Sequence, residues 1–134
     1  MSAADAATVL VANYAVLTRR VIAEPVAPAE YAEAGIAPGA PGVSAELALF
    51  ADQRVARTWD KDDVATDYSI QSVHLDGPDA AIVKATLGMT AYTRPDRVTV
   101  DSAAWIAHVI RIERPGATWV IASDNTDPLN GMTG

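Results

Sequence analysis

The spacing of apolar residues changes once along the chain, and this change restricts the fold more than any other feature. Up to about residue 60, apolar side chains recur every three or four positions, which is typical of amphipathic helices. From Val64 onward they alternate with polar side chains, which is typical of strands with one buried face. The sequence therefore predicts one α+β domain over residues 1–124, with helices first and an antiparallel meander after them.

Capping residues and breakers divide the first half into helices. Ser2 is placed to cap the first helix, and Gly35 to end the second. The stretch 37–42 reads APGAPG and cannot continue a helix, and Ser44 then caps a third helix with Glu46 in its first turn. The predicted helices cover residues 3–24, 28–34 and 45–59.

Turn residues divide the second half into strands, predicted at 67–75, 80–93, 103–113 and 118–124. The third strand has Ile106, His108 and Ile110 on one face. The other face, which begins with Trp105, is nearly as apolar, so the pattern leaves open which of the two is buried. The polar, glycine-containing residues 125–134 are expected to form a flexible tail.

Charge and composition exclude several classes of protein. The net charge is -7 and the largest basic cluster is the pair Arg19–Arg20, so nucleic acid is not an expected partner. The chain has no cysteine, and no phosphate-binding glycine loop or nucleophile motif, so no cofactor is expected. The first residues do not read as a signal peptide, and no apolar run approaches the roughly 18 residues of a membrane span. We therefore expect a cytoplasmic protein without a membrane partner.

The last hairpin carries a resemblance to a known family. It runs from His108 and has Gly116 at the turn with Trp119 three residues later. Together with the preceding helices, over about residues 44–124, this arrangement resembles the cystatin-like and nuclear transport factor 2-like superfamily. The resemblance implies a sheet that curls around the first helix into a cone with an apolar pocket. Four strands and a Pro/Gly loop in place of a short early strand fit a reduced, cystatin-like version equally well.

The face shared by His108 suggests where a ligand could bind. An imidazole among apolar side chains could act as a general acid or base, and the alternative is a partly buried, hydrogen-bonded structural histidine. His108 is the single catalytic candidate. The expected ligand-binding residues lie on the same strand faces and on the first helix: Tyr14, Tyr68, Met89, Ile106 and Ile110.

Other conspicuous residues suggest contacts rather than chemistry. Large or charged side chains on the sheet are candidates for a homodimer interface, namely Trp105, Arg111 and Trp119. The acidic residues near 60–63 and at Asp124 and Asp127 do not have the spacing of a calcium loop. We expect them to be solvated, and we expect no metal site.

Three functions remain open from the sequence. The first is a noncatalytic domain that binds a small apolar molecule, or a protein, through a pocket between sheet and helix. The second is a cofactor-independent cyclase, isomerase or hydrolase of the polyketide-cyclase type with His108 as acid or base. The third is a dimerisation module. Whether the chain is an enzyme is left open, because folds of this kind host many activities.

Overall fold

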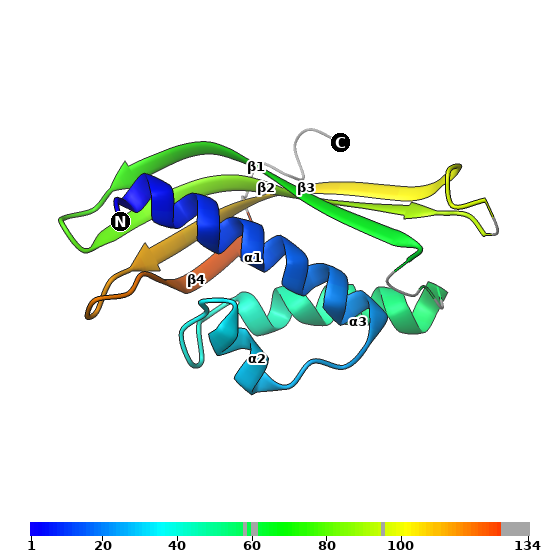
Figure 1. Cartoon of the computed structure of the whole chain (residues 1–134), viewed down its shortest axis with the longest axis horizontal. Helices are drawn as coiled ribbons and strands as arrows, with labels where there is room; N and C mark the ends of the chain where they lie inside the picture. Colours follow the sequence, from blue (N-terminus) through cyan, green and yellow to red (C-terminus); the bar gives the residue numbers. More distant parts are fainter. Residues whose placement is uncertain (58, 60–61, 95, 127–134) are drawn as a thin grey trace.

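The computed structural model describes every residue except 58, 60–61, 95 and 127–134, and describes 28, 53–57 and 126 by their backbone alone. Its seven elements are α1 (Ala3–Ala23), α2 (Pro28–Glu33), α3 (Val43–Arg57), β1 (Val64–Leu75), β2 (Ala80–Tyr92), β3 (Val100–Glu113) and β4 (Val120–Thr126). The strands form one antiparallel sheet in the order β1-β2-β3-β4. All three helices lie on one side of this sheet (Figure 1). The predicted α+β fold class is thus confirmed.

Helix α1 provides most of the apolar layer beneath the sheet. The Ser2 hydroxyl caps it by accepting a hydrogen bond from the Asp5 N–H at 3.1 Å, as the sequence predicts. The buried residues of α1 recur every three or four positions, and the side of the helix that they form packs against the inner faces of β1 and β2. This side consists of Ala3, Ala6, Ala7, Leu10, Val11, Tyr14, Ala15, Leu17, Thr18, Val21 and Ile22.

The length and apolar composition of α1 would also allow it to cross a membrane, which the sequence analysis did not anticipate. In the described structure 56% of that stretch is buried inside the protein. Core helices of globular domains pass the same test of length and hydropathy. The absence of a membrane partner stays a prediction.

Strands β2 and β3 show the predicted two-sided pattern. The inner side of β2 is buried at every second residue, namely at Ala81, Val83, Ala85, Leu87, Met89 and Ala91. In β3 the buried side is the one that carries His108 and Ile110. This answers the question, left open by the sequence, of which face of the strand is buried. On the other side of the sheet Trp105 is 55% exposed and lies over Gly88 of the neighbouring strand.

The Pro/Gly loop between α2 and α3 runs beside β4. The backbones of Ile36 and Ile121 form an isolated parallel bridge, and the Asp124 N–H donates to the Pro41 carbonyl at 2.9 Å. The bridge and this hydrogen bond cover part of the outer edge of β4, which would otherwise leave backbone groups unpaired.

Several element boundaries differ from the sequence prediction by one to three residues, among them the start of α3 and the end of β4. Helix α3 begins at Val43, so Ser44 lies inside the helix and is not its cap. The chain reverses at Gly42, whose φ of +83° is favourable for glycine, and the helix starts directly after it. Strand β4 continues to Thr126, so the first two residues of the expected tail are paired with β3. The rest of that tail, 127–134, lies outside the described residues.

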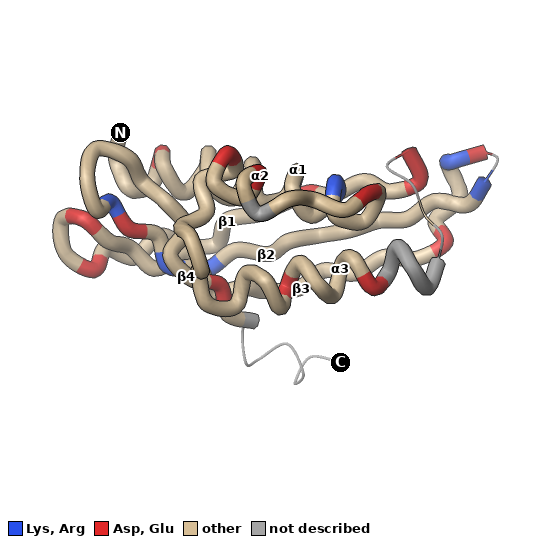
Figure 2. The backbone as a smooth tube through the Cα atoms, turned by 90° about the horizontal axis from the view of Figure 1, so that it is seen from below, with Lys and Arg blue, Asp and Glu red and all other residues tan. Residues whose placement is uncertain are grey.

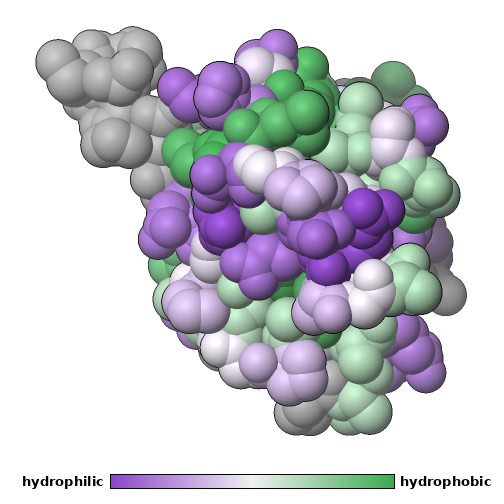
Figure 3. Space-filling view, turned by 90° about the vertical axis from the view of Figure 1, so that its left-hand side faces the viewer, coloured by the Kyte–Doolittle hydropathy of each residue, from purple (hydrophilic) through white to green (hydrophobic). Residues whose placement is uncertain are grey.

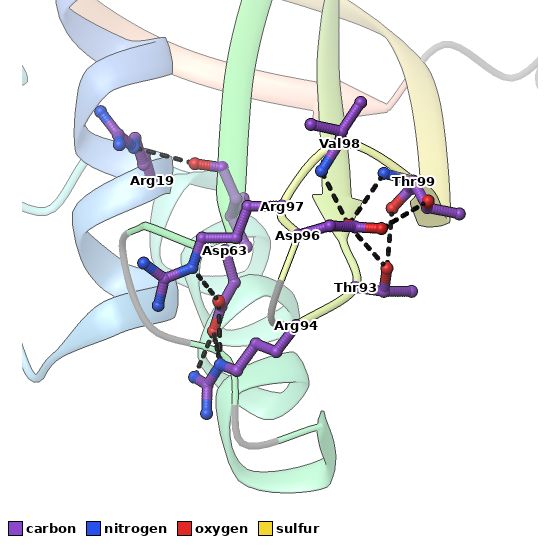
Figure 4. A network of polar contacts seen from close by, with 9 residues as sticks. Arg19, Asp63, Thr93, Arg94, Asp96, Arg97, Val98 and Thr99 are labelled. Carbon is purple, nitrogen blue, oxygen red and sulfur yellow. Dashed lines mark hydrogen bonds and ion pairs between the residues drawn. The ribbon is translucent and has the colours of Figure 1, made fainter.

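A network of ion pairs and hydrogen bonds closes the end of the sheet where β2 turns into β3. Asp63, which is 1% exposed, accepts hydrogen bonds from Arg94 and from Arg97 (Figure 4). The expectation that this acidic cluster is solvated is wrong for Asp63. Two guanidinium groups compensate its burial, and they tie the connection between β2 and β3 to the start of β1.

The opposite end of the sheet carries ion pairs between turns. Arg111 pairs with Asp76 and Glu113, and Arg114 pairs with Asp79. Figure 3 looks onto this end, where hydrophilic side chains form a band across the surface. Among the residues that Figure 2 colours by charge, the basic ones lie mainly toward the two ends of the molecule, whereas the acidic ones are spread more widely.

Candidate functional site

Four polar side chains from four different elements meet inside the apolar core. They are Tyr14 of α1, Glu46 of α3, His108 of β3 and Asp124 of β4, and the exposed fraction of each residue is 7% or less. Buried polar groups are costly unless they bind one another. The four residues, called here the core polar cluster, do this through a chain of contacts.

Asp124 is the centre of this chain. The Tyr14 hydroxyl donates to its Oδ2 at 2.6 Å, and Nδ1 of His108 lies 2.9 Å and 3.0 Å from its two oxygens. Because a carboxylate only accepts hydrogen bonds, Nδ1 carries the proton of the imidazole. In the neutral ring the lone pair then lies on Nε2.

The Nε2 atom of His108 is directed toward Glu46. It lies 3.5 Å from Oε1 of Glu46, and it has no hydrogen-bond partner among the described residues. A separation of 3.5 Å is too long for a normal hydrogen bond between nitrogen and oxygen. The cluster therefore ends in a buried acceptor atom without a partner.

Burial also changes the acidity of two members of the cluster. It raises the pKa of Tyr14 far above its usual range, and the negative charge of Asp124 raises it further, so the phenol remains a hydrogen-bond donor. Burial raises the pKa of Glu46 as well, while the neighbouring His108 opposes and Asp124 adds to this shift.

An irregularity in β4 turns Asp124 into the core. The register between β3 and β4 shifts because Ala122 is an extra residue: Ile121 pairs with Ile112, and Ser123 already pairs with Arg111. After this bulge Asp124 shares the inner face with Ile121, whereas strict alternation would direct it outward. The expectation that Asp124 is solvated is therefore wrong.

Gly42 brings the two carboxylates of the cluster together. Its carbonyl accepts the first hydrogen bond of α3, from the Glu46 N–H at 3.0 Å. A Cβ atom at Gly42 would lie 1.6 Å from the carbonyl oxygen of Asp124, so only glycine fits this close approach. The loop that the sequence marks as a breaker therefore positions both Glu46 and Asp124.

An apolar pocket adjoins the cluster at Glu46. It lies between α3 and the inner sides of β2 and β3 and has a volume of about 290 Å³. Glu46 and Ser102 are its polar lining residues. The remaining lining is apolar and consists of Leu49, Phe50, Leu87, Met89, Ala104 and Ile106. A carboxyl group in an apolar hollow is a common arrangement in ligand sites.

The residues expected to bind a ligand are distributed over several places. Met89 and Ile106 line the pocket. Tyr14 belongs to the core polar cluster, Tyr68 packs against the core, and Ile110 is fully buried in it. Their role in binding stays a prediction.

His108, the catalytic candidate, has a fully buried side chain and is separate from the pocket lining. Its neighbours Glu46 and Asp124 were not predicted as site residues from the sequence. Glu46 was recognisable only as a carboxylate in the first turn of a predicted helix. The alternation of residues in the last strand gave no indication that Asp124 is buried.

The three interface candidates lie in different surroundings. Trp105 is exposed on the open side of the sheet, and Arg111 is half-buried and ion-paired. Trp119 is only 7% exposed, lies in the core and contacts the Arg114 guanidinium, so it offers little surface to a partner. Dimerisation through the sheet stays a prediction.

Comparison with known proteins supports the fold. No protein-family model matches the sequence, and no curated protein matches it. An NTF-2-like protein of unknown function from Shewanella oneidensis MR-1 superposes with a TM-score of 0.55 at 14% identity, over 92% of this chain and 97% of that one. A ketosteroid isomerase-like protein from Erwinia carotovora atroseptica gives 0.52 at 18% identity, over 93% and 92%.

A third similar structure is the intermembrane space region of the chloroplast protein ARC6, with a TM-score of 0.50 at 17% identity over 94% of this chain and 96% of that one. At these identities the likeness concerns the fold and not the activity. The helices on one side, the curved meander and these neighbours agree: the chain has the nuclear transport factor 2-like, cone-shaped α+β fold.

Proposed function

We propose that this protein binds a small, largely apolar molecule in the pocket between α3, β2 and β3, and that Glu46 is its polar contact. The observation that supports this most is the pocket itself, in which one carboxyl group adjoins an otherwise mainly apolar lining. The apolar surface would provide the affinity, and the carboxyl group would orient a hydroxyl or amine of the ligand.

The pocket can accept a ligand without rearrangement of the core. Leu49 is 59% exposed at its rim, and Ala104 is exposed on β3. The deeper lining residues Leu87 and Met89 are buried and belong to the packed sheet. A rigid floor with an accessible rim lowers the entropic cost of binding.

The enzyme hypothesis with His108 as acid or base has less support. A bound molecule in the pocket contacts Glu46 first, because Glu46 lines the pocket and the His108 side chain is fully buried. Direct contact with the reacting atoms is the first requirement for a general acid or base. We therefore favour binding over catalysis by His108.

A fluorescent apolar dye, 1-anilinonaphthalene-8-sulfonate, tests the proposal. The native protein should bind it saturably, and Ala104→Trp should abolish binding because the indole fills the pocket. The matched control is Ala103→Trp: Ala103 is the exposed neighbour on the other side of β3 and is not part of the lining. Equal dye binding by both variants would show that the dye does not occupy this pocket, and absence of binding to the native protein would refute the proposal.

A further inference from the structure

The two buried carboxylates of the core polar cluster are short of positive charge. Among the described residues, the basic partner of both Glu46 and Asp124 is His108, which can carry one charge at most. By contrast, the buried Asp63 has two arginine partners. Carboxylates buried to this degree are usually compensated by cations or by metal ions.

The atoms of the cluster are spaced like metal ligands. One donor atom each from Glu46, His108 and Asp124 lies within 4.8 Å of the other two. Asp124 is bound to Nδ1, so the donors that face each other across the gap are Nε2 of His108 and the Glu46 carboxylate. The 3.5 Å between Nε2 of His108 and Oε1 of Glu46 is too long for a good hydrogen bond. It is close to the separation of about 3.4 Å between two ligands that are each about 2.1 Å from a tetrahedral ion.

The protonation of His108 also suits a metal ion. Its Nδ1 donates to Asp124, which leaves the lone pair on Nε2, and in the described part of the chain this buried atom has no hydrogen-bond partner. Metal-binding histidines commonly donate their second ring N–H to a carboxylate, which fixes the tautomer and the ring orientation. Asp124 holds the imidazole in this way, and the Tyr14 hydroxyl in turn holds Asp124.

We propose that Nε2 of His108 and the carboxylate of Glu46 bind a divalent transition-metal ion such as Zn²⁺, with Asp124 as the positioning residue. Mixed imidazole and carboxylate donors suit Zn²⁺ better than they suit Ca²⁺ or Mg²⁺. Because Glu46 lines the pocket, water or a bound molecule can complete the coordination from that side. The metal site shares Glu46 with the proposed ligand pocket. Zn²⁺ binding can nevertheless be measured without any pocket ligand, so the two proposals can fail separately.

Calorimetric titration of the untagged, chelator-treated protein with Zn²⁺ tests this proposal. We expect saturable binding of one ion per chain and a higher Tm when the ion is present. Glu46→Gln and His108→Gln should each weaken binding at least about tenfold, and Asp124→Asn should weaken it about 10-fold to 100-fold. With Co²⁺ in place of Zn²⁺, visible absorption bands should appear and should be lost in Glu46→Gln.

The control is His74→Gln, because His74 is exposed on β1 and lies outside the cluster. This variant should bind Zn²⁺ as the native protein does. Circular dichroism establishes that each variant is folded before titration. Absence of saturable Zn²⁺ binding by the native protein would overturn the proposal whatever the variants do. Binding that is lost in His74→Gln but retained in Glu46→Gln would also overturn it.

Discussion

The imidazole of His108 and the carboxylate of Asp124 connect β3 to β4 inside the core, with Nδ1 2.9 Å from Oδ1. Tyr14 extends this connection to α1 through its hydrogen bond to Oδ2. The first helix and the last two strands of the chain are therefore joined by directional contacts in addition to apolar packing. Such contacts specify which residues meet, because a misplaced partner leaves a buried polar group unsatisfied.

The first prediction concerns Tyr14→Phe, which removes the donor to Asp124 and leaves the ring in place. A hydrogen bond to a charged acceptor contributes about 1.5–3 kcal/mol, so we expect the free energy of unfolding to fall by about 2 kcal/mol. Urea denaturation measures this. The control is Tyr31→Phe, since Tyr31 is partly buried and its hydroxyl has no hydrogen bond among the described residues; it should change stability by less than about 0.5 kcal/mol. Equal effects of both changes would contradict the assigned contact.

The second prediction compares two glycines of the same loop. Gly42 and Gly39 both have positive φ angles, +83° and +66°, so an alanine at either position costs about 1–2 kcal/mol of backbone strain. At Gly42 the new methyl group would in addition overlap the Asp124 carbonyl, whereas at Gly39 no atom lies within 4 Å. We expect Gly42→Ala to lower the free energy of unfolding by at least about 2 kcal/mol more than Gly39→Ala. Similar losses in the two variants would show that the loop does not press against Asp124.

The sequence predicts the fold well because the change of period reflects burial itself. Alternation in β2 and β3 follows from one face that meets the helices, and the inner face found in the structure is one of the two that the sequence allowed. The capping role of Ser2 was also predictable, because it depends only on residues that are neighbours in the sequence. By contrast, Ser44 has the same residue type and is not a cap, because the turn at Gly42 starts the helix earlier.

The candidate site is less predictable because it depends on one bulge and on tertiary contact. Alternation from Ile121 directs Asp124 to the outside, and only the extra residue Ala122 reverses this. His108 was recognisable as an imidazole on an apolar strand face. Its partner Glu46 lies 62 positions earlier in the sequence, and the spacing of the two residues does not indicate that they meet. They are brought together only because α3 lies beneath β3 in the folded protein.

The third prediction concerns the contact between Gly88 and Trp105. A Cβ atom at Gly88 would lie 2.1 Å from the Trp105 ring, so Gly88→Ala must displace the indole from the open side of the sheet. Because this side chain is half-exposed, it can rotate into solvent at a cost of about 1 kcal/mol. We expect a red shift of tryptophan emission and a small loss of stability.

Gly116→Ala is the control for this contact, since no atom lies within 4 Å of a Cβ atom there. It should leave the emission unchanged. In a Trp105→Phe background, Gly88→Ala should no longer shift the emission, because Trp59 and Trp119 are buried in the core clusters and not on the open side of the sheet. A red shift that persists in this background would assign the effect to another tryptophan.

The last prediction concerns pH and the connection between β2 and β3. The Asp96 carboxylate accepts hydrogen bonds from the N–H groups of Val98 and Thr99 at 3.0 Å and 3.2 Å, and from the hydroxyls of Thr93 and Thr99 (Figure 4). These bonds, those from the backbone first, lower the pKa of Asp96 to about 2.

Because the pKa of Asp96 is lower in the folded state than the value of about 3.9 in an unfolded chain, its carboxylate stabilises the connection above that pH. This contribution is lost as the pH falls through about 2, where the carboxylate becomes protonated in the folded state. The amide resonances of Val98 and Thr99 should therefore titrate with a midpoint near 2 in NMR spectra, and Asp96→Asn should remove the titration. A midpoint near 4 would mean that the hydrogen bonds do not favour the ionised form of Asp96 and would contradict this prediction.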